Sequence, residues 1–564
     1  MALPPEMKQP DSFDPRHAWL LALVTCVVGT MLLAYPALSG QFLVNIYSDQ
    51  YIAGYSFREF GAQVLRATGG FALWNPYLFG GMPYVGAMHG DIFYPTALLR
   101  LAMPTDAAMT WGMILHYILG GYATYVFLRA LGLKFFGALV GAVAYMLSGW
   151  NASYVSPGHD GKIFVGAMLP LAMLCVLRGV RDGRNWAWGG LSLVVGLGML
   201  SPHPQLMQYL LMGTGVFGLY VAFGIDGRPD QRQAVRRLAF ALGAVALGFA
   251  ISAIQYLPVM EYTPFSPRAG GRGYDFATSF SFPPVELINT LIPEFTGILD
   301  KYWGPNGIHH HSEYIGAAVW LLAVAAFRTQ ARTRDVLFWG GVVVLFTLWA
   351  LGGNTPFYQI IYNLVPGSKF FRAPSTVFFV ATFAMAILAG FGAQSLVERA
   401  PSRRFLLAGA GTIALLFLLG VTGAMTGIAG AFAAPEVAER VQEQRGSPDV
   451  RDDPGHGLRR ARPRRVCAAR PRGRLGDGRG MGVRRYRHAR PGERDAYLLG
   501  LHAARQGQLR HRCRDRVHQD GDGHQPGPRH RYADRRQLGA ARSRAPLQRP
   551  DGARHPSGRG VPWQ

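Results

Sequence analysis

Long apolar segments recur along the first 430 residues of this 564-residue chain, and they limit the folds that it can adopt. An α-helix needs about 20 apolar residues to cross the hydrocarbon core of a bilayer. Segments near that length lie at 18–38, 109–129, 136–155, 238–257, 376–394 and 405–426, and shorter or glycine-interrupted ones lie at 163–178, 187–201, 206–224, 313–328 and 336–352. The sequence therefore predicts an all-α polytopic membrane protein with about eleven transmembrane helices.

This pattern divides the chain into three parts. Residues 1–17 hold three acidic residues, and no small-residue cleavage site follows them, so we expect a cytoplasmic N-terminus and a retained first helix in place of a signal peptide. Residues 18–430 form the predicted membrane domain, with two long outer loops at 39–108 and 258–312. Residues 431–564 form a tail rich in Arg, Gly and Pro.

The tail differs from the rest of the chain in composition. From Arg445 to the end there are 30 Arg, no Lys and 11 acidic residues, whereas the preceding 444 residues hold 27 basic and 22 acidic ones. Because it also lacks Ile, Phe, Thr and Asn, this segment cannot bury enough apolar surface to fold alone. We interpret the tail as unfolded, or as an out-of-frame reading of a GC-rich gene. Nucleic acid is not an expected partner, because nucleic-acid-binding tails normally mix Lys with Arg.

Basic and neutral connections alternate between the apolar segments. The basic connections carry Arg129 and Lys134; Arg178, Arg181 and Arg184; Arg228, Arg232, Arg236 and Arg237; Arg328, Arg332 and Arg334; and Arg399, Arg403 and Arg404. The positive-inside rule assigns them to the cytoplasm. Five connections then face outside, at 39–108, 156–162, 202–205, 258–312 and 353–375. Ion-coupled transport is disfavoured, because no Asp or Glu lies deep in a predicted span.

Five motifs occur in order along the membrane domain: SDQ (48–50), WNPYLFGGMPY (74–84), HDGK (159–162), QYLPVMEYTPFSPR (255–268) and FFRAPS (370–375). Together they resemble the YfhO family of bacterial membrane proteins over about residues 15–430. The resemblance implies a GT-C-like architecture in the bacterial inner membrane, with catalytic acids on the first outer loop. It also implies a glycosyltransferase that takes a sugar from a polyprenyl-phosphate donor, a lipid-linked sugar, and adds it to a cell-envelope glycopolymer or lipid.

Such a transfer needs a carboxylate that accepts a proton from the attacking hydroxyl, and cations that hold the departing phosphate. Asp49, shortly after the first span, is the candidate base; the alternative is a cap for the next helix, a role that Ser48 would also serve. Asp91 is the second candidate catalytic acid, either orienting the acceptor or helping to bind a divalent cation such as Mg²⁺ or Mn²⁺. The alternative for Asp91 is a turn residue that follows Gly90.

Candidate substrate-binding residues lie on the other outer connections. His159, Asp160 and Lys162 crowd a short turn. Lys162 either pairs with a donor phosphate or snorkels from its helix end to the membrane surface. His203 is placed similarly in the next short connection.

The two longer connections add further candidates. Glu261 and Arg268 suit phosphate or sugar hydroxyls, or they pair with each other. Lys369 and Arg372 break the charge bias of the outer face, so we expect a partner for them, either a phosphate headgroup or an internal carboxylate. The histidine run at 309–311 is disfavoured as a metal site, because adjacent histidines cannot all point at one ion.

Two other functions stay open at this point. A non-enzymatic lipid or polysaccharide exporter predicts a polar path through the helices, whereas the spans of this chain are apolar. A structural scaffold for envelope assembly would tolerate the loss of the Asp49 carboxylate.

Overall fold

The computed structural model of the chain describes residues 14–433, apart from 46, 89, 267–268, 270–271, 298–301, 307–310 and 329–331. The Arg-rich tail from residue 434 onward and the candidate residue Arg268 lie outside the described residues. The described part of the chain is mostly helical, as the apolar segments predict.

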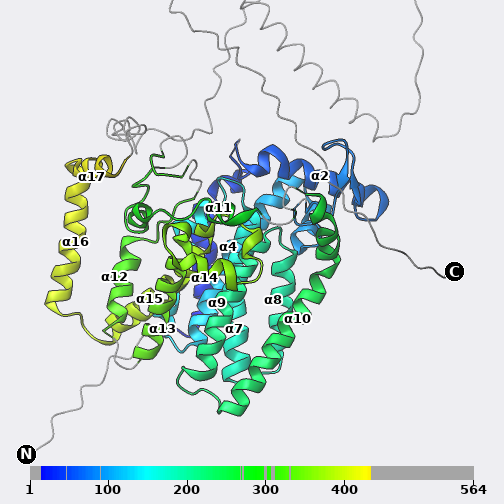
Figure 1. Cartoon of the computed structure of the whole chain (residues 1–564). Coiled ribbons are helices and arrows are strands. Elements are labelled where there is room, and N and C mark those ends of the chain that lie inside the picture. Colours follow the sequence, from blue (N-terminus) through cyan, green and yellow to red (C-terminus); the bar gives the residue numbers. More distant parts are fainter. Residues whose placement is uncertain are drawn as a thin grey trace, which may run out of the picture. The chain divides into compact units, whose positions relative to one another are not determined.

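The α-helices of the described residues are α1 (Ala18–Leu33), α2 (Tyr55–Thr68), α3 (Leu99–Ala102), α4 (Thr105–Ala130), α5 (Phe135–Met146), α6 (Gly149–Ser153), α7 (Asp160–Val176), α8 (Trp186–Leu200), α9 (Pro204–Phe223), α10 (Gln231–Tyr262), α11 (Gly273–Thr278), α12 (Ala317–Ala326), α13 (Thr333–Ala350), α14 (Phe357–Leu364), α15 (Phe378–Glu398), α16 (Arg403–Val421) and α17 (Ala424–Phe432) (Figure 1). Short 3₁₀ or π segments are η1 (Tyr35–Ser39), η2 (Gln50–Gly54), η3 (Pro95–Leu98), η4 (Leu177–Arg181), η5 (Thr263–Phe265), η6 (Pro284–Thr290), η8 (Gly352–Asn354), η9 (Ser368–Phe370) and η10 (Pro374–Val377). Strands β1 (Trp74–Asn75) and β2 (Met82–Pro83) pair antiparallel, with Trp74 opposite Pro83.

All eleven predicted spans contain a helix. Seven segments, those of α5, α7, α9, α10, α13, α15 and α16, are long and apolar enough to cross a membrane. Helices α1, α8 and α12 are shorter apolar helices, and α4 has 26 residues. The predicted fold class, an all-α polytopic membrane protein, is confirmed.

Local capping fixes where several of these helices begin. The Asp230 carboxylate accepts a hydrogen bond from the backbone N–H of Gln233 at the start of α10 (3.0 Å). The Ser402 hydroxyl accepts from the backbone N–H of Phe405 at the start of α16 (3.2 Å). Each cap satisfies a backbone donor that has no partner within its own helix.

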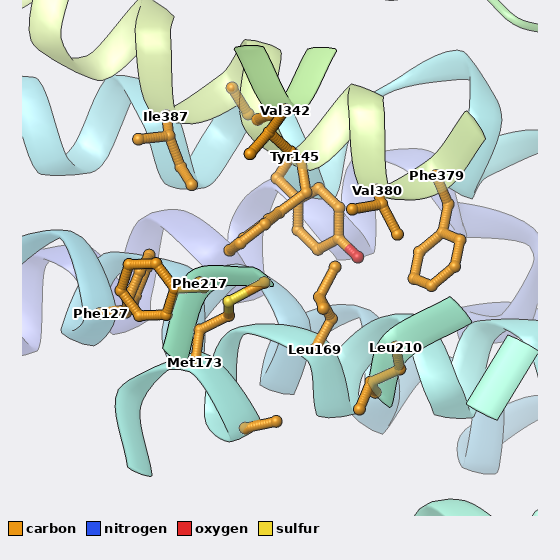
Figure 2. Packing of buried hydrophobic residues seen from close by; sticks show 14 of the residues in the cluster. Phe127, Tyr145, Leu169, Met173, Leu210, Phe217, Val342, Phe379, Val380 and Ile387 are labelled. Carbon is orange, nitrogen blue, oxygen red and sulfur yellow. The ribbon is translucent and has the colours of Figure 1, made fainter. Parts of the chain in front are cut away.

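Helix α15 lies in the core of the bundle and packs against α5, α12 and α13. It carries no charge from Phe378 to Val397 and its apolar span is entirely buried, the pattern of a helix with neighbours on every side. Small residues bring α5 and α15 close together, since a Cβ on Gly390 would lie 2.8 Å from the carbonyl oxygen of Gly137. Figure 2 shows this core, with labelled side chains from six helices: Phe127, Tyr145, Leu169, Met173, Leu210, Phe217, Val342, Phe379, Val380 and Ile387.

The basic connections contact one another. Their arginines donate to backbone carbonyls of neighbouring basic connections: Arg181 to Ala130, Arg237 to Val180, Arg332 to Leu131 and Arg328 to Ala400. Connections that the charge pattern assigns to one side of the membrane therefore lie together, and we call this region the basic end.

Candidate functional site

A pocket of about 860 Å³ lies where the five neutral connections meet. Each connection supplies at least one lining residue: Asp49, His159, His203, His311 and Arg372, in chain order. The structure thus brings together the connections that the sequence assigned to the other side of the membrane, and we call this region the pocket end. Which end faces outward stays a prediction of the positive-inside rule.

Asp49 lines this pocket, and its side chain does not cap the helix that follows. The hydroxyl of Ser48 accepts the hydrogen bond from the backbone N–H of Tyr51 (3.2 Å), and the Asp49 side chain makes no cap hydrogen bond. The backbone N–H of Asp49 donates to the carbonyl oxygen of Pro157 (3.1 Å), which ties the two connections together. The carboxylate is 77% exposed and lies 3.5 Å from His159 Nε2.

A row of nitrogen atoms leads inward from Asp49. His159 Nδ1 lies 3.2 Å from His311 Nε2, which lies 3.0 Å from Lys162 Nζ. Lys162 is 5% exposed and its ammonium lies 5.2 Å from the centre of the Tyr154 ring, so the snorkelling alternative is wrong. Among the described residues no carboxylate forms an ion pair with Lys162. The pocket therefore holds a buried amine that can bind an anion when it is protonated.

Arg58 of α2 holds the pocket end together. Its Nε donates to Asp91 (2.7 Å), its Nη2 to Asp160 (2.6 Å) and its Nη1 to Gln50 (2.7 Å). Burial alone would lower the pKa of Arg58, but the carboxylates of Asp160 and Asp91 raise it above its ordinary value. The guanidinium is therefore a permanent cation that joins the first outer loop to the start of α7.

Asp91 belongs to this buried network and does not line the pocket. Its carboxylate accepts hydrogen bonds from Arg58, from Arg100 (3.0 and 3.1 Å) and from the hydroxyl of Thr96 (2.6 Å). Burial alone would raise its pKa, but Arg100 and Arg58 lower it below the ordinary value. Two adjacent cations do not suit a site for Mg²⁺ or Mn²⁺. Within the described part of the chain, no group of three His, Cys, Asp or Glu side chains is placed to hold a metal ion.

Asp160 lines the pocket, but its oxygens are bonded within the protein. Its Oδ1 accepts from Gln50 Nε2 (2.8 Å) and from the backbone N–H of Gly161 (2.9 Å), while its Oδ2 accepts from Arg58. Gly158 permits this contact, since its φ is +78° and a Cβ there would lie 2.7 Å from the Gln50 side chain. Asp160 therefore positions neighbouring groups.

Of the remaining candidate substrate-binding residues, only some line the pocket. Arg372 lines the pocket, with its guanidinium 5.3 Å from the centre of the Phe280 ring. Lys369 is exposed and lies 5.5 Å from the centre of the Tyr362 ring, outside the pocket lining. Glu261, near the end of α10, is also exposed and outside the lining. Arg268 lies outside the described residues, so its pairing with Glu261 stays a prediction.

Backbone strain gathers around the pocket. Five described residues other than glycine have positive φ, and four of them line it: Phe79 (50°), Met88 (60°), Phe280 (58°) and Ala373 (57°). Such conformations are uncommon for residues with a Cβ and are found disproportionately at functional sites. Their gathering around one cavity marks it as the candidate site without reference to its charges.

Sequence reasoning missed several residues of the site. Arg58 is a cation on a predicted outer connection and needs an anionic partner. The same reasoning singled out Lys369 and Arg372, and it could have found Arg58. Glu286 and Glu313 line the pocket and are 2% and 4% exposed. An acid within an apolar, proline-rich outer loop is the signal that indicates Glu286.

A second, mostly apolar pocket of about 350 Å³ lies between α2 and the segment 92–101. Phe71, Ile92 and Leu101 are among its apolar lining residues. Arg58 lines both pockets, so the apolar one borders the main one.

The fold and the site define a polytopic α-helical membrane protein with a polar pocket built from five connections at one end of its helices. No protein-family model matches the sequence, and no curated protein matches it, so the resemblance to the YfhO family stays a prediction. Among solved structures, the chain is similar to the arabinofuranosyltransferase AftD from Mycobacteria, at 14% identity and a TM-score of 0.45. The similarity covers 73% of this chain and 27% of that chain, so this chain spans about a quarter of the AftD length.

Proposed function

We propose that this protein is a membrane glycosyltransferase that moves a sugar from a polyprenyl-phosphate donor to a cell-envelope acceptor on the extracytoplasmic side. One observation carries the proposal. An exposed carboxylate, Asp49, lines the same pocket as two basic side chains, Lys162 and Arg372, that no described carboxylate pairs. Transfer from a phosphate donor needs this combination of a base and an anion site.

The transfer makes two bonds, one from the acceptor oxygen to the sugar and one from the proton to Asp49, and it breaks two. Asp49 accepts the proton of the acceptor hydroxyl as that oxygen forms a bond to the anomeric carbon of the sugar. The bond from that carbon to the phosphate oxygen breaks, and the phosphate keeps the electron pair. Lys162 and Arg372 bind the phosphate and stabilise the charge that develops on it.

His159 supports the base. With its Nε2 3.5 Å from the Asp49 carboxylate, it orients that group and can receive the proton that Asp49 has taken. His311 Nε2 lies within hydrogen-bond distance of both His159 Nδ1 and Lys162 Nζ, so it links the side chains around the base to those around the phosphate. Asp91 and Asp160 act as positioning residues through Arg58.

The donor also carries a lipid tail, and the apolar pocket of about 350 Å³ offers room for its first part. Arg58 borders both cavities, so a tail in the apolar pocket leaves its phosphate beside the main one. The exporter alternative is less well supported, since α15, in the core of the bundle, carries no charge from Phe378 to Val397.

The test is sugar transfer by the full chain in lipid nanodiscs, with undecaprenyl-phosphate sugars as donors. Asp49→Asn should lower the transfer rate by about 10²–10⁴-fold, the usual contribution of a general base. Asp275→Asn is the matched control, because Asp275 is an exposed aspartate of α11 outside the pocket lining. Full activity in correctly inserted Asp49→Asn protein would remove the assignment of the base.

A further inference from the structure

The first outer loop carries a run of exposed apolar side chains beside the pocket. We propose that this run inserts into the surface of the surrounding bilayer and holds the mouth of the pocket at the membrane surface. Its partner is the phospholipid of the membrane that the helices cross, and the inference does not depend on the proposed function. We call the run the lipid-facing segment; it comprises Phe71, Leu73, Trp74, Tyr77 and Phe79.

The lipid-facing segment is apolar, aromatic and uncharged. Its five side chains are 51%, 77%, 54%, 84% and 91% exposed, in chain order. Residues 67–90, which contain it, include no Asp, Glu, Lys or Arg. Exposed apolar side chains that gather in this way mark a contact with a partner or a membrane. Trp and Tyr are the residues enriched where a protein meets the boundary between lipid and water.

A separate set of buried side chains fixes this loop in place. Ala72 and Tyr84 are 4% and 3% exposed. They belong to a buried cluster against which Phe60 and Val64 of α2 pack. The hydroxyl of Tyr84 also donates to the carbonyl oxygen of Phe57 (2.7 Å). The loop therefore has a buried face that packs on α2, and the lipid-facing segment is apolar surface that remains outside it.

The neighbouring end of α10 marks the level of the membrane surface. Gly86 packs against it, since a Cβ on Gly86 would lie 3.1 Å from the carbonyl oxygen of Pro258. On α10, a candidate membrane span, Leu257 and Met260 are 64% and 68% exposed, whereas the next residue, Glu261, is an exposed charge. The exposed side of α10 thus changes from apolar to charged beside this loop. The lipid-facing segment therefore lies close to the boundary between acyl chains and headgroups.

Phe79 joins the lipid-facing segment to the main pocket. It lines that pocket, is 91% exposed and has a φ of +50°. A bulky side chain rarely adopts a positive φ, and such strain is found disproportionately where a function uses it. The strained turn leaves an apolar ring exposed at the mouth of the pocket, where contact with acyl chains would remove its surface from water. Phe71 lines the smaller apolar pocket, so both pockets border the lipid-facing segment.

An environment-sensitive nitrobenzoxadiazole label on single introduced cysteines tests the inference, with the full chain in phosphatidylcholine nanodiscs. Cys467→Ser and Cys513→Ser remove the thiols of the tail. Cys26 and Cys175 are buried and should not react. Some nanodiscs carry a nitroxide quencher near the start of the acyl chain, and others carry it near the end.

The label is placed at Leu73→Cys or at Phe79→Cys. An interfacial segment reaches about 5–10 Å into the boundary between headgroups and acyl chains. Both labels should therefore lose most of their fluorescence to the shallow quencher and little to the deep one. Gln63→Cys is the matched control, because Gln63 is an exposed polar residue of α2 on the same loop and donates to Glu59 (2.9 Å). Its label should keep its fluorescence with both quenchers.

Full fluorescence at positions 73 and 79 with the shallow quencher would overturn the inference. Emission shifted to the blue without quenching would mean that a protein, such as a second copy of this chain, covers the segment, and the lipid would not be its partner. Equal quenching at position 63 would place the whole loop in lipid, and the assignment of a lipid-facing segment would fail. Because all three positions are exposed, each variant keeps the buried contacts of the loop.

Discussion

The two ends of the membrane domain hold their charges differently. At the basic end, Arg334 pairs with Asp226 at 3.1 Å, and both side chains are mostly exposed, at 66% and 76%. At the pocket end, Arg58 is 3% exposed and pairs with both Asp91 and Asp160. Arg334 is thus a surface charge, whereas Arg58 is a buried link between connections.

The difference lies in what happens when a charge is removed. An exposed ion pair contributes up to about 1 kcal/mol, because water solvates whichever partner remains. Removing one member of a buried pair costs about 3–5 kcal/mol, because the other charge stays buried without compensation. Removal of the surface charge of Arg334 should therefore cost little stability, whereas removal of the buried charge of Arg58 should disrupt the pocket end.

The largest effect should come from Arg58→Met. The variant keeps an apolar stem of similar length but leaves Asp160 without the guanidinium and Asp91 with Arg100 alone. We expect the free energy of unfolding to fall by about 3–5 kcal/mol. Thermal unfolding in one detergent, followed by tryptophan fluorescence, measures the change.

Arg58→Lys should recover part of this loss, because an ammonium cannot make the three directed hydrogen bonds of the guanidinium. It also supplies a measurable variant if Arg58→Met does not accumulate. The comparison between the two ends would be wrong if Arg58→Met and Arg334→Met lowered stability equally.

A smaller effect is expected on ligand binding, and it should distinguish Lys162 at the pocket end from Lys134 at the basic end. Lys162→Met should weaken the binding of undecaprenyl phosphate about 10–100-fold, the value of a charged hydrogen bond in a buried site. Lys134→Met removes the same group from the basic end, where Lys134 is exposed, and should leave binding unchanged. Titration of both variants in nanodiscs with undecaprenyl phosphate measures the two affinities. If both variants bind the lipid equally weakly, the lipid adsorbs to surface charge and does not occupy a specific site.

Much of this architecture could be predicted from the sequence. Helices occupy all eleven apolar segments, because length and hydropathy dictate them locally. The alternation of basic connections grouped Asp49, His159 and Arg372 on one side before any contact between them was known, and all three line the pocket.

The partners of these residues could not be predicted, because they depend on contacts far along the chain. Arg58 meets Asp91 and Asp160 across 33 and 102 positions, and no short-range pattern encodes such a pairing. Lys369 and Arg372 are both cations on a predicted outer connection, three residues apart. Arg372 lines the pocket and Lys369 does not, because η9 ends between them. The sequence therefore grouped the connections that line the candidate site, and packing decides which of their charges line the pocket.

The smallest effect belongs to the pair of Arg334 and Asp226. A double-mutant cycle with Arg334→Met and Asp226→Asn should give a coupling free energy of about 0.2–1 kcal/mol in unfolding. The coupling should vanish in 1 M salt, where the screening length falls to about 3 Å, near the 3.1 Å that separates the two groups. The cycle of Arg58 and Asp160, 3% and 8% exposed, should keep most of its coupling under the same conditions. A salt-resistant coupling at Arg334 would mean that this pair behaves like the buried pair of Arg58 and Asp160, and the distinction between a surface charge and a buried one would fail.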